Sequence, residues 1–166
     1  GFVTGASQGL GQEIAVARAR DGCDVAVPSR RIERLSNTLG LIEKAGARAV
    51  PVELDVRSEQ SMARAMAEVA GAFGAVDALV NNAAVTLRAS ALEMTRAEWD
   101  ELMSVNLKGV FFMSQLMGRH LVEKKRPGCV VSLASTHGML GFAGRSAYGI
   151  AKAGIIQMTR QLAIEW

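Results

Sequence analysis

The sequence predicts an α/β domain with a doubly wound parallel sheet and helices on both faces. Short apolar runs alternate with longer segments of helical period throughout the 166 residues, which is typical of strands joined by crossover helices. A glycine-rich turn follows the first apolar run and opens the first helix. Right-handed crossovers between parallel strands then cover both sides of the sheet.

We expect strands at residues 2–4, 24–28, 48–53, 78–80 and 130–133. Each run is short and apolar, as expected for a strand that is buried on both faces. Ser58 is the predicted N-cap of the helix between the third and fourth strands, and Thr95 forms a predicted capping box with Glu98. Residues 1–166 therefore read as a single domain. The expected helices lie at residues 9–20, 31–45, 58–73, 95–125 and 147–166.

Composition argues against several classes of function. Apolar residues make up 49% and charged residues 21% of the chain, as in ordinary globular proteins, and no apolar run approaches the ~20 residues of a membrane span. The net charge of +3 is scattered and aromatic residues are only 5%, so we expect no nucleic-acid or membrane partner. Cys23 and Cys129 have neither metal nor disulfide spacing, which favours a cytoplasmic location.

Both ends of the predicted domain look truncated. The first apolar run is very short, because the glycine-rich turn begins at once after it. The last helix reaches Trp166 without a cap or a following strand. We therefore expect the sequence to be a fragment of a longer chain.

The glycine-rich turn has the spacing Gly-x-x-x-Gly-x-Gly. Gly5 allows a tight turn, Gly9 lets the backbone approach a pyrophosphate, and Gly11 lets the helix pack closely on the sheet. Phosphates would then meet free N–H groups at the helix N-terminus, whereas a glycine-rich turn without a ligand is the alternative. The predicted cofactor contacts from this turn are Gly5, Ser7, Gln8, Gly9, Leu10 and Gly11.

The ends of the second and third strands suggest how an adenosine would be held. An acidic residue after the second strand holds the ribose when the cofactor is NAD, but this chain has Ser29 and Arg30. Arg30 could bind a 2′-phosphate to which Ser29 donates a hydrogen bond, which favours NADP, with NAD as the alternative. A plain surface helix starting at Arg30 and Arg31 would explain the same residues. Asp55 could accept from the adenine amino group while Val56 packs on the ring.

Two asparagine motifs follow. Residues 81–84 read Asn-Asn-Ala-Ala after the fourth strand, and small residues there would let a cofactor lie against the backbone at Asn82, Ala83 and Ala84. The Asn side chains could tie this loop to neighbouring strands. Asn106 falls within an apolar helical stripe, where an unpartnered amide would cost roughly 1–3 kcal/mol. Asn106 could order a water beside a buried lysine. The alternative is a core asparagine whose amide forms hydrogen bonds within the protein and has no catalytic role.

The last helix carries Tyr148 and Lys152, which lie four residues apart and share a face. A free phenol has a pKa near ~10 and is a poor acid–base catalyst at neutral pH, but a cation one turn away favours the phenolate. Ser135, just after the fifth strand, could point into the same cleft and hold a substrate oxygen. A surface Tyr and Lys on an ordinary helix are the alternative.

Three further polar residues receive structural interpretations. His120 and His137 have no partner at the spacing of a metal site or a catalytic triad, so we interpret His120 as helix surface and His137 as a loop residue. Ser132 rivals Ser135, but strand alternation favours its pointing into the packing of the sheet. No metal site is predicted.

Taken together, these residues resemble the classical branch of the short-chain dehydrogenase/reductase family. The resemblance covers essentially all of the chain and implies a Rossmann-like NAD(P)-binding domain. Ala84 stands where the family more often has Gly, and Gln8 where NADP-preferring members often carry a basic residue. Family members usually continue with further strands and a mobile substrate loop. The matching positions, in family order, are residues 4–11, Asp55, residues 81–84, residues 105–109, Ser135, Tyr148 and Lys152.

The resemblance implies an oxidoreductase that transfers a hydride between NADP(H) and a carbonyl or secondary alcohol. Tyr148 would exchange a proton with the substrate oxygen, and Ser135 would orient that oxygen. Lys152 would favour the phenolate and bind the nicotinamide ribose beside Tyr148, and Asn106 would hold a water of a proton relay. Implied substrates are 3-oxoacyl thioesters or gluconate and other sugars, and implied partners are further copies in a dimer or tetramer. A dinucleotide-binding module without turnover is the alternative function.

Overall fold

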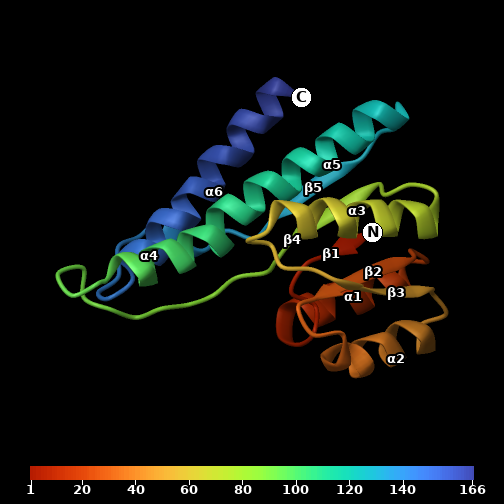
Figure 1. The fold of residues 1–166 in the computed structure, drawn as a ribbon, viewed down its shortest axis with the longest axis horizontal. Helices are drawn as coiled ribbons and strands as arrows, with labels where there is room; N and C mark the ends of the chain where they lie inside the picture. Colours follow the sequence, from red (N-terminus) through yellow and green to blue (C-terminus); the bar gives the residue numbers. More distant parts are fainter.

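The computed structural model describes residues 1–166 and contains a five-stranded parallel sheet with the order β3-β2-β1-β4-β5. Figure 1 shows the sheet between two layers of helices. The direction of strand succession reverses at β1, where open α/β sheets form a ligand-binding crevice at the carboxyl ends of their strands. The strands are β1 (Phe2–Val3), β2 (Val25–Ser29), β3 (Ala49–Glu53), β4 (Ala78–Asn81) and β5 (Cys129–Ser132).

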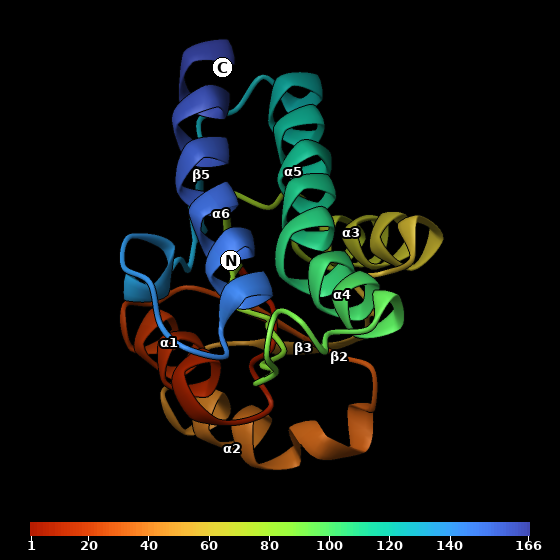
Figure 2. The same ribbon diagram turned by 90° about the vertical axis from the view of Figure 1, so that its left-hand side faces the viewer.

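The helices lie on both faces of the sheet, as predicted for a doubly wound, Rossmann-like fold. Helices α1 (Gly9–Arg20) and α2 (Ser36–Lys44) cover one face. Helices α3 (Glu59–Phe73) and α5 (Val110–Lys124) cover the other. Helix α6 (Ser146–Glu165) runs beside α5 on that second side, as Figures 1 and 2 show.

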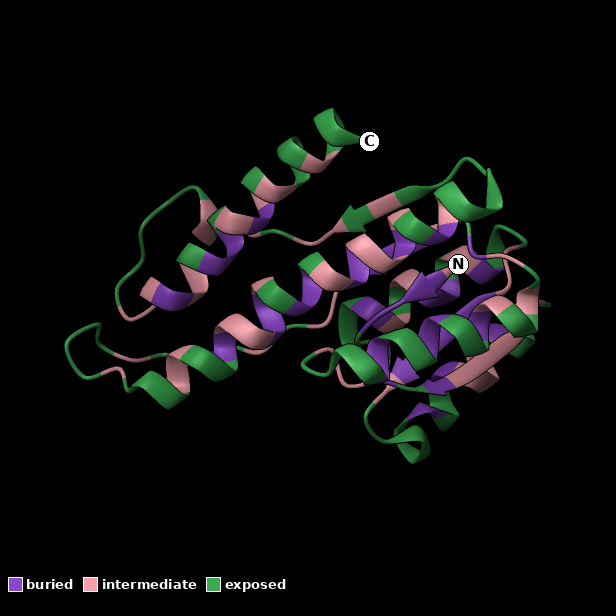
Figure 3. Cartoon of the chain, turned by 45° about the horizontal axis from the view of Figure 1, so that its top comes forward, coloured by how far each residue is buried: buried purple, intermediate pink, exposed green.

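Strand alternation divides the buried apolar residues between two cores. Phe2 and Leu79 pack with α3 and α5, whereas the neighbouring Val3 and Val80 pack with α1 and α2. All four side chains are buried, because successive residues of a strand point to opposite faces of the sheet. Figure 3 shows the buried residues along the strands and the inner sides of the helices, while the carboxyl end of α6 is exposed. No helix is both long and apolar enough to cross a membrane.

Two predicted helices are interrupted. The helix expected at residues 31–45 begins as a 3₁₀ turn, η1 (Ile32–Leu35), and continues as α2. The helix expected at residues 95–125 is divided into α4 (Arg96–Met103), a π-helical segment η2 (Ser104–Gly109) and α5. Segments of π-helix commonly occur at functional sites, and this one holds Asn106.

Both predicted helix caps are confirmed. Ser58 Oγ accepts a hydrogen bond from the backbone N–H of Ser61 at 3.2 Å. Thr95 and Glu98 bond reciprocally in a capping box at the start of α4. These bonds satisfy N–H groups that a helix N-terminus otherwise leaves unpaired.

The interpretation of His120 as helix surface is wrong. His120 is only 9% exposed, and its Nε2 accepts a hydrogen bond from the backbone N–H of Val76 at 3.0 Å. The side chain thereby ties α5 to the segment before β4. Helical period alone did not indicate this contact, because its partner lies 44 residues earlier in the chain.

Candidate active site

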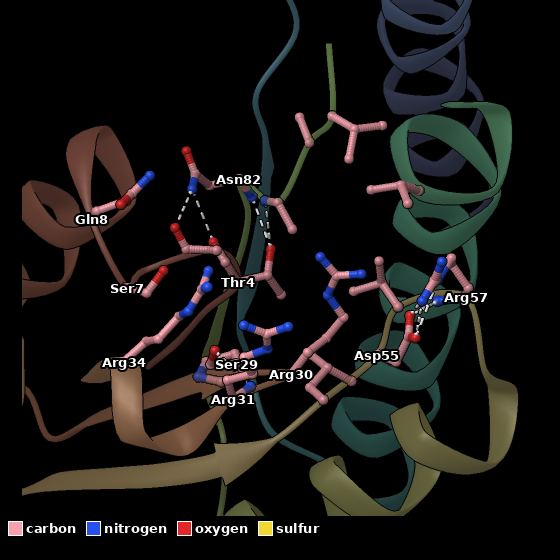
Figure 4. Close-up of a pocket in the computed structure, with 18 residues that line it drawn as sticks. Thr4, Ser7, Gln8, Ser29, Arg30, Arg31, Arg34, Asp55, Arg57 and Asn82 are labelled. Atoms are coloured by element: carbon pink, nitrogen blue, oxygen red, sulfur yellow. Dashed lines mark hydrogen bonds and ion pairs between the residues drawn. The ribbon is translucent and has the colours of Figure 1, made fainter. Parts of the chain in front are cut away.

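A cavity of about 590 Å³ lies at the carboxyl ends of the strands (Figure 4). Four loops, after β1, β2, β3 and β4, form its walls, which is the place expected for a ligand of this fold. Most of the predicted cofactor contacts line it. These lining residues are Gly5, Ser7, Gln8, Ser29, Arg30, Asp55, Val56, Asn82, Ala83 and Ala84.

The glycine-rich loop has no space for larger side chains at two positions. Gly5 has φ +67°, and a Cβ built on it would lie 2.8 Å from Cα of Ala83. A Cβ on Gly11 would collide with the carbonyl oxygen of Gly5 and with Nδ2 of Asn82. Gly9 also has a positive φ of +60°, but space is open beside it. The loop is therefore packed tightly on its inner side and accessible at Gly9.

The N-terminus of α1 is uncapped by side chains. Its N-cap residue, Gln8, makes no side-chain hydrogen bond to the helix, and the first turn has no acidic residue. The helices α3 and α4, by contrast, have Ser58 and Thr95 as caps. Free N–H groups and the positive end of the helix dipole at a glycine loop fit a phosphate group.

Asn82, directly after β4, holds the glycine-rich loop in place. Asn82 Nδ2 donates to the carbonyl oxygens of Thr4 and Gly5 at 3.0 and 3.1 Å. Thr4 Oγ1 accepts in return from the backbone N–H groups of Asn82 and Ala83. The predicted tie between this loop and its neighbouring strand is thus confirmed.

Asn81 acts in the opposite direction, toward β5 and α5. Its Nδ2 donates to Ser114 Oγ at 3.0 Å and to Ser132 Oγ at 3.2 Å. The interpretation of Ser132 as a packing residue is confirmed by this bond. A contact of Ser135 with a substrate stays a prediction.

We expect Gly11→Ala to lower the free energy of unfolding by about 1–3 kcal/mol, the usual cost of overpacking a tight contact. The added methyl group would push against Asn82 and the Gly5 carbonyl and so weaken the loop. Urea unfolding measures the loss. Gly40→Ala is the matched control, because Gly40 lies within α2 with nothing within 4 Å of a Cβ. The control should gain about 0.5–1 kcal/mol, and equal effects of the two substitutions would contradict the tight packing at Gly11.

Three arginines gather on one side of the cavity without any anionic partner. Arg30, Arg31 and Arg34 line it, and none of their guanidinium groups forms an ion pair within the chain. Figure 4 shows Arg34 extending toward the loop that carries Ser7. Uncompensated guanidinium groups beside a cavity fit a phosphate, which they can bind through two parallel hydrogen bonds.

Arg34 was missed by the sequence reasoning. The 3₁₀ turn η1 brings it back to the cavity one turn after Arg31. A helix starting at Arg31 would already have placed position 34 on the same side, since residues three apart share a face. The spacing of three residues between Arg31 and Arg34 is therefore the signal that could have identified Arg34.

Asp55 reaches the cavity already paired. Arg57 Nε donates to Asp55 Oδ1 at 2.9 Å, and Arg57 Nη2 donates to Asp55 Oδ2 at 2.6 Å. Arg57 also donates to Glu101 of α4 at 3.0 Å. Hydrogen bonding from Arg57 holds the pKa of Asp55 below its ordinary value, against the opposing effect of burial. Contact between Asp55 and an adenine stays a prediction, and the adenine would compete with Arg57, which donates to both carboxylate oxygens.

Lys152 is buried next to Tyr148 in α6. It is only 4% exposed, and its Nζ donates to the carbonyl oxygen of Leu133 at 2.6 Å. The same Nζ lies 5.7 Å from the centroid of the Tyr148 ring. Burial lowers the pKa of Lys152, because a low-dielectric surrounding penalises the ammonium form. The predicted shared face of Tyr148 and Lys152 is present.

Ser135 begins a short 3₁₀ turn, η3 (Thr136–Gly138), that leads toward α6. Its Oγ accepts from the backbone N–H of His137 at 3.2 Å and lies 3.3 Å from His137 Nδ1. The His137 ring meets the Tyr148 ring edge-on, with centroids 5.5 Å apart. His137 lies in the connection between β5 and α6, as predicted, and its side chain contacts both Ser135 and Tyr148.

Asn106 is fully buried and its amide is satisfied on both sides. Oδ1 accepts from the backbone N–H of Val85 at 2.8 Å, and Nδ2 donates to the Val85 carbonyl at 2.8 Å. The side chain therefore clamps the segment that follows Ala84 to the π-helical segment. A water held by Asn106 beside Lys152 stays a prediction.

One residue that holds the glycine-rich loop was not predicted. Thr38 of α2, not predicted, donates to the carbonyl of Ala6 at 2.9 Å and accepts from Gln12 Nε2 at 2.7 Å, which fixes the glycine-rich loop from below. No local pattern signals this role, because the contact forms only when α2 packs on α1.

The predicted contacts outside the cavity walls are Gly9, Leu10, Gly11, Tyr148 and Lys152.

A doubly wound parallel sheet with a glycine-rich turn between β1 and α1 defines a Rossmann-like domain. The family model described as short chain dehydrogenase matches residues 2–166. The chain belongs to this short-chain dehydrogenase family, as its resemblance indicated.

Similar proteins agree with this assignment. The chain is 35% identical to the probable 2,4-dienoyl-CoA reductase of Bacillus subtilis (strain 168), over 99% of the chain and 65% of that protein. It is 34% identical to the 2-dehydro-3-deoxy-D-gluconate 5-dehydrogenase of Escherichia coli (strain K12), over 99% of the chain and 64% of that protein. A metagenomic short-chain oxidoreductase solved in complex with NADP superposes with a TM-score of 0.93 at 32% identity, over 99% of the chain and 74% of that structure. The chain thus spans about 65% of the length of these curated relatives.

Proposed function

We propose that the protein is an NADP(H)-linked oxidoreductase that interconverts a carbonyl and a secondary alcohol. The observation that carries the proposal is the cluster in which buried Lys152 lies 5.7 Å from the Tyr148 ring, while His137 joins that ring to the Ser135 hydroxyl. Family membership supports the same reaction class. Arginines without ion-pair partners line the cavity at the carboxyl ends of the strands, which fits the phosphate groups of a dinucleotide.

Each residue of the cluster has a distinct role in this proposal. Tyr148 donates its phenolic proton to the substrate oxygen in reduction and removes a proton in oxidation. Ser135 donates a hydrogen bond to that oxygen and stabilises its developing negative charge. Lys152 supplies positive charge beside the phenol. Hydride exchange with the reacting carbon is the chemistry that a nicotinamide cofactor supplies when bound.

The cofactor would be held by the loops around the cavity. Gly9 and the free N–H groups of α1 would bind the pyrophosphate, and Arg30 would bind the 2′-phosphate of NADP with help from Ser29. Lys152 and Tyr148 would approach the nicotinamide ribose. The similar structure in complex with NADP supports the choice of NADP over NAD, as do the arginines without anionic partners.

Two substrate classes have support. One relative is named as a 3-oxoacyl-[acyl-carrier-protein] reductase and another for a sugar acid, in line with the thioester and sugar classes expected from the sequence. The loops at residues 86–92 and 139–145 meet near Tyr148, because Ala89 N–H donates to the Gly144 carbonyl and Arg145 donates to the Leu87 carbonyl. They would form one wall of the substrate site.

The test is a fluorescence titration with NADPH and NADH, followed by NADPH oxidation with acetoacetyl-CoA, a keto-gluconate and a wider carbonyl panel. We expect clearly tighter binding of NADPH and turnover of at least one carbonyl by the whole protein. Tighter binding of NADH would show that Arg30 does not engage the cofactor. Binding of neither nucleotide, or binding without turnover of any carbonyl, would contradict the proposed reaction.

The second candidate is a dinucleotide-binding module without turnover. The chain's coverage of about 65% of its curated relatives favours it for these residues taken alone, since part of a substrate site could lie elsewhere. NADPH binding by residues 1–166 without turnover, combined with turnover by the whole protein, would distinguish the two functions.

Assembly into a dimer or tetramer through α5 and α6 and a cytoplasmic location also stay proposals. Ile155 of α6 is 1% exposed within the single chain and cannot contribute to such an interface. Ile156 and Met158 are half-buried, and Met158 lines the groove between α5 and α6. Sedimentation of the whole protein measures its oligomeric state.

A further inference from the structure

The ring of His137 makes two aromatic contacts. It stacks on Phe142 with ring centroids 4.1 Å apart and an interplanar angle of 26°. It meets Tyr148 edge-on at 5.5 Å and 88°. These contacts fix the plane of the ring, and its Nδ1 lies 3.3 Å from Ser135 Oγ.

The backbone around His137 is equally constrained. A Cβ on Gly149 would lie 2.9 Å from the His137 carbonyl oxygen, and a Cβ on Gly138 would lie 2.7 Å from the Lys152 carbonyl carbon. The turn η3 therefore packs directly against α6, in the helical turns that carry Tyr148 and Lys152. The distance between the His137 ring and Ser135 depends on this packing and not on a free loop.

The Ser135 hydroxyl can accept two hydrogen bonds and donate one. The backbone N–H of His137 already donates to it at 3.2 Å. If the ring accepted at Nδ1, 3.3 Å away, the only hydroxyl proton would be used on His137 and none would remain for a substrate. If the ring donates from Nδ1–H, both acceptor positions are filled and the proton is free to point at a substrate oxygen.

We propose that His137 is a positioning residue whose Nδ1–H donates to Ser135 Oγ and so directs the Ser135 proton to the substrate oxygen. This inference rests on the proposed function, because it assigns the orientation of one of its catalytic groups. His137 acts through Ser135 and does not itself contact the substrate oxygen. The aromatic stack with Phe142 serves to hold the ring in this orientation.

The test is a double-mutant cycle between His137→Leu and Ser135→Ala in the whole protein. We expect His137→Leu to lower kcat about tenfold, the effect of losing one well-placed hydrogen bond, with NADPH affinity unchanged. In the Ser135→Ala background the same substitution should change kcat less than about twofold, because coupled residues are not additive. A full tenfold loss in both backgrounds would overturn the proposal.

Two amide variants keep the test decisive if His137→Leu fails to fold. In His137→Asn the amide nitrogen occupies the position of Nδ1, and kcat should stay within about threefold of the wild type. In His137→Gln the amide lies one bond further from the backbone. We expect this variant to lose about as much kcat as His137→Leu. Equal kcat values for the two variants would overturn the proposal. If Ser135→Ala and Tyr148→Phe themselves leave turnover unchanged, the proposed function fails instead, and the two failures are thereby distinguished.

Discussion

Tyr148→Phe is expected to lower kcat/KM for carbonyl reduction by about 10²–10⁴-fold, the usual contribution of a general acid–base residue. The substitution removes one hydroxyl and keeps the ring, so the contact with His137 at 5.5 Å and the position above Lys152 remain. NADPH binding should therefore change only a few-fold. Steady-state kinetics with the best carbonyl of the panel, together with a fluorescence titration, measure both quantities.

Thr159→Val is the matched control for this experiment. It removes a hydroxyl from the same helix, where Thr159 Oγ1 only donates to the carbonyl of Ile155, and it should leave kcat/KM within about twofold, as expected for a surface position. If Tyr148→Phe retained more than a tenth of wild-type activity, another group would have to move the proton. Loss of NADPH binding in the same variant would point to damage of the fold.

Arg30→Ala is expected to weaken NADPH binding by about 10–100-fold, as removal of a charge-assisted hydrogen bond does, while NADH binding stays within about twofold. The guanidinium group of Arg30 lies at the cavity with no ion-pair partner in the chain. Arg34→Ala should have a smaller effect in the same direction. Titrations of each variant with both nucleotides give the preference directly.

Arg20→Ala is the control for the loss of one positive charge, because Arg20 lies at the far end of α1 and is exposed. It should leave both affinities unchanged. An equal loss of NADPH and NADH affinity in Arg30→Ala would mean that Arg30 attracts both dinucleotides and does not bind the 2′-phosphate specifically. Such a general effect would also weaken strongly with added salt, since long-range attraction is screened.

Much of the fold could be predicted from local pattern. The first helix was expected at residues 9–20 and is observed there, because a glycine turn before it and a Gly-Cys-Asp segment after it delimit an alanine-rich run. The caps at Ser58 and Thr95 follow equally local rules. The observed ends of the strands differ from the expected ends by at most one residue, since apolar runs are distinct even when their ends are not.

The candidate site could be predicted where residue spacing carries the chemistry. Tyr148 and Lys152 share a face whenever their segment is helical, and the spacing of Gly5, Gly9 and Gly11 between a strand and a helix predicts a tight turn there. Interruptions of helices were not predictable in the same way. The π-helical segment around Asn106 arises where Gly109 packs against the loop at Val56, a Cβ there lying 2.7 Å from the Val56 carbonyl oxygen.

The sequence by itself determined the fold class, the family and the chemical types of residue at the site, because these depend on periodicity and on spacing within single elements. Only the tertiary structure decided that Arg57 forms hydrogen bonds to the carboxylate of Asp55 and that His120 is buried. The same holds for the contacts of the His137 ring with Ser135 and Tyr148. The pairing of Arg57 with Glu101 and the bond between Val76 and His120 each span 44 residues. Contacts of that kind are created by the packing of one element on another, and no periodicity along the chain encodes them.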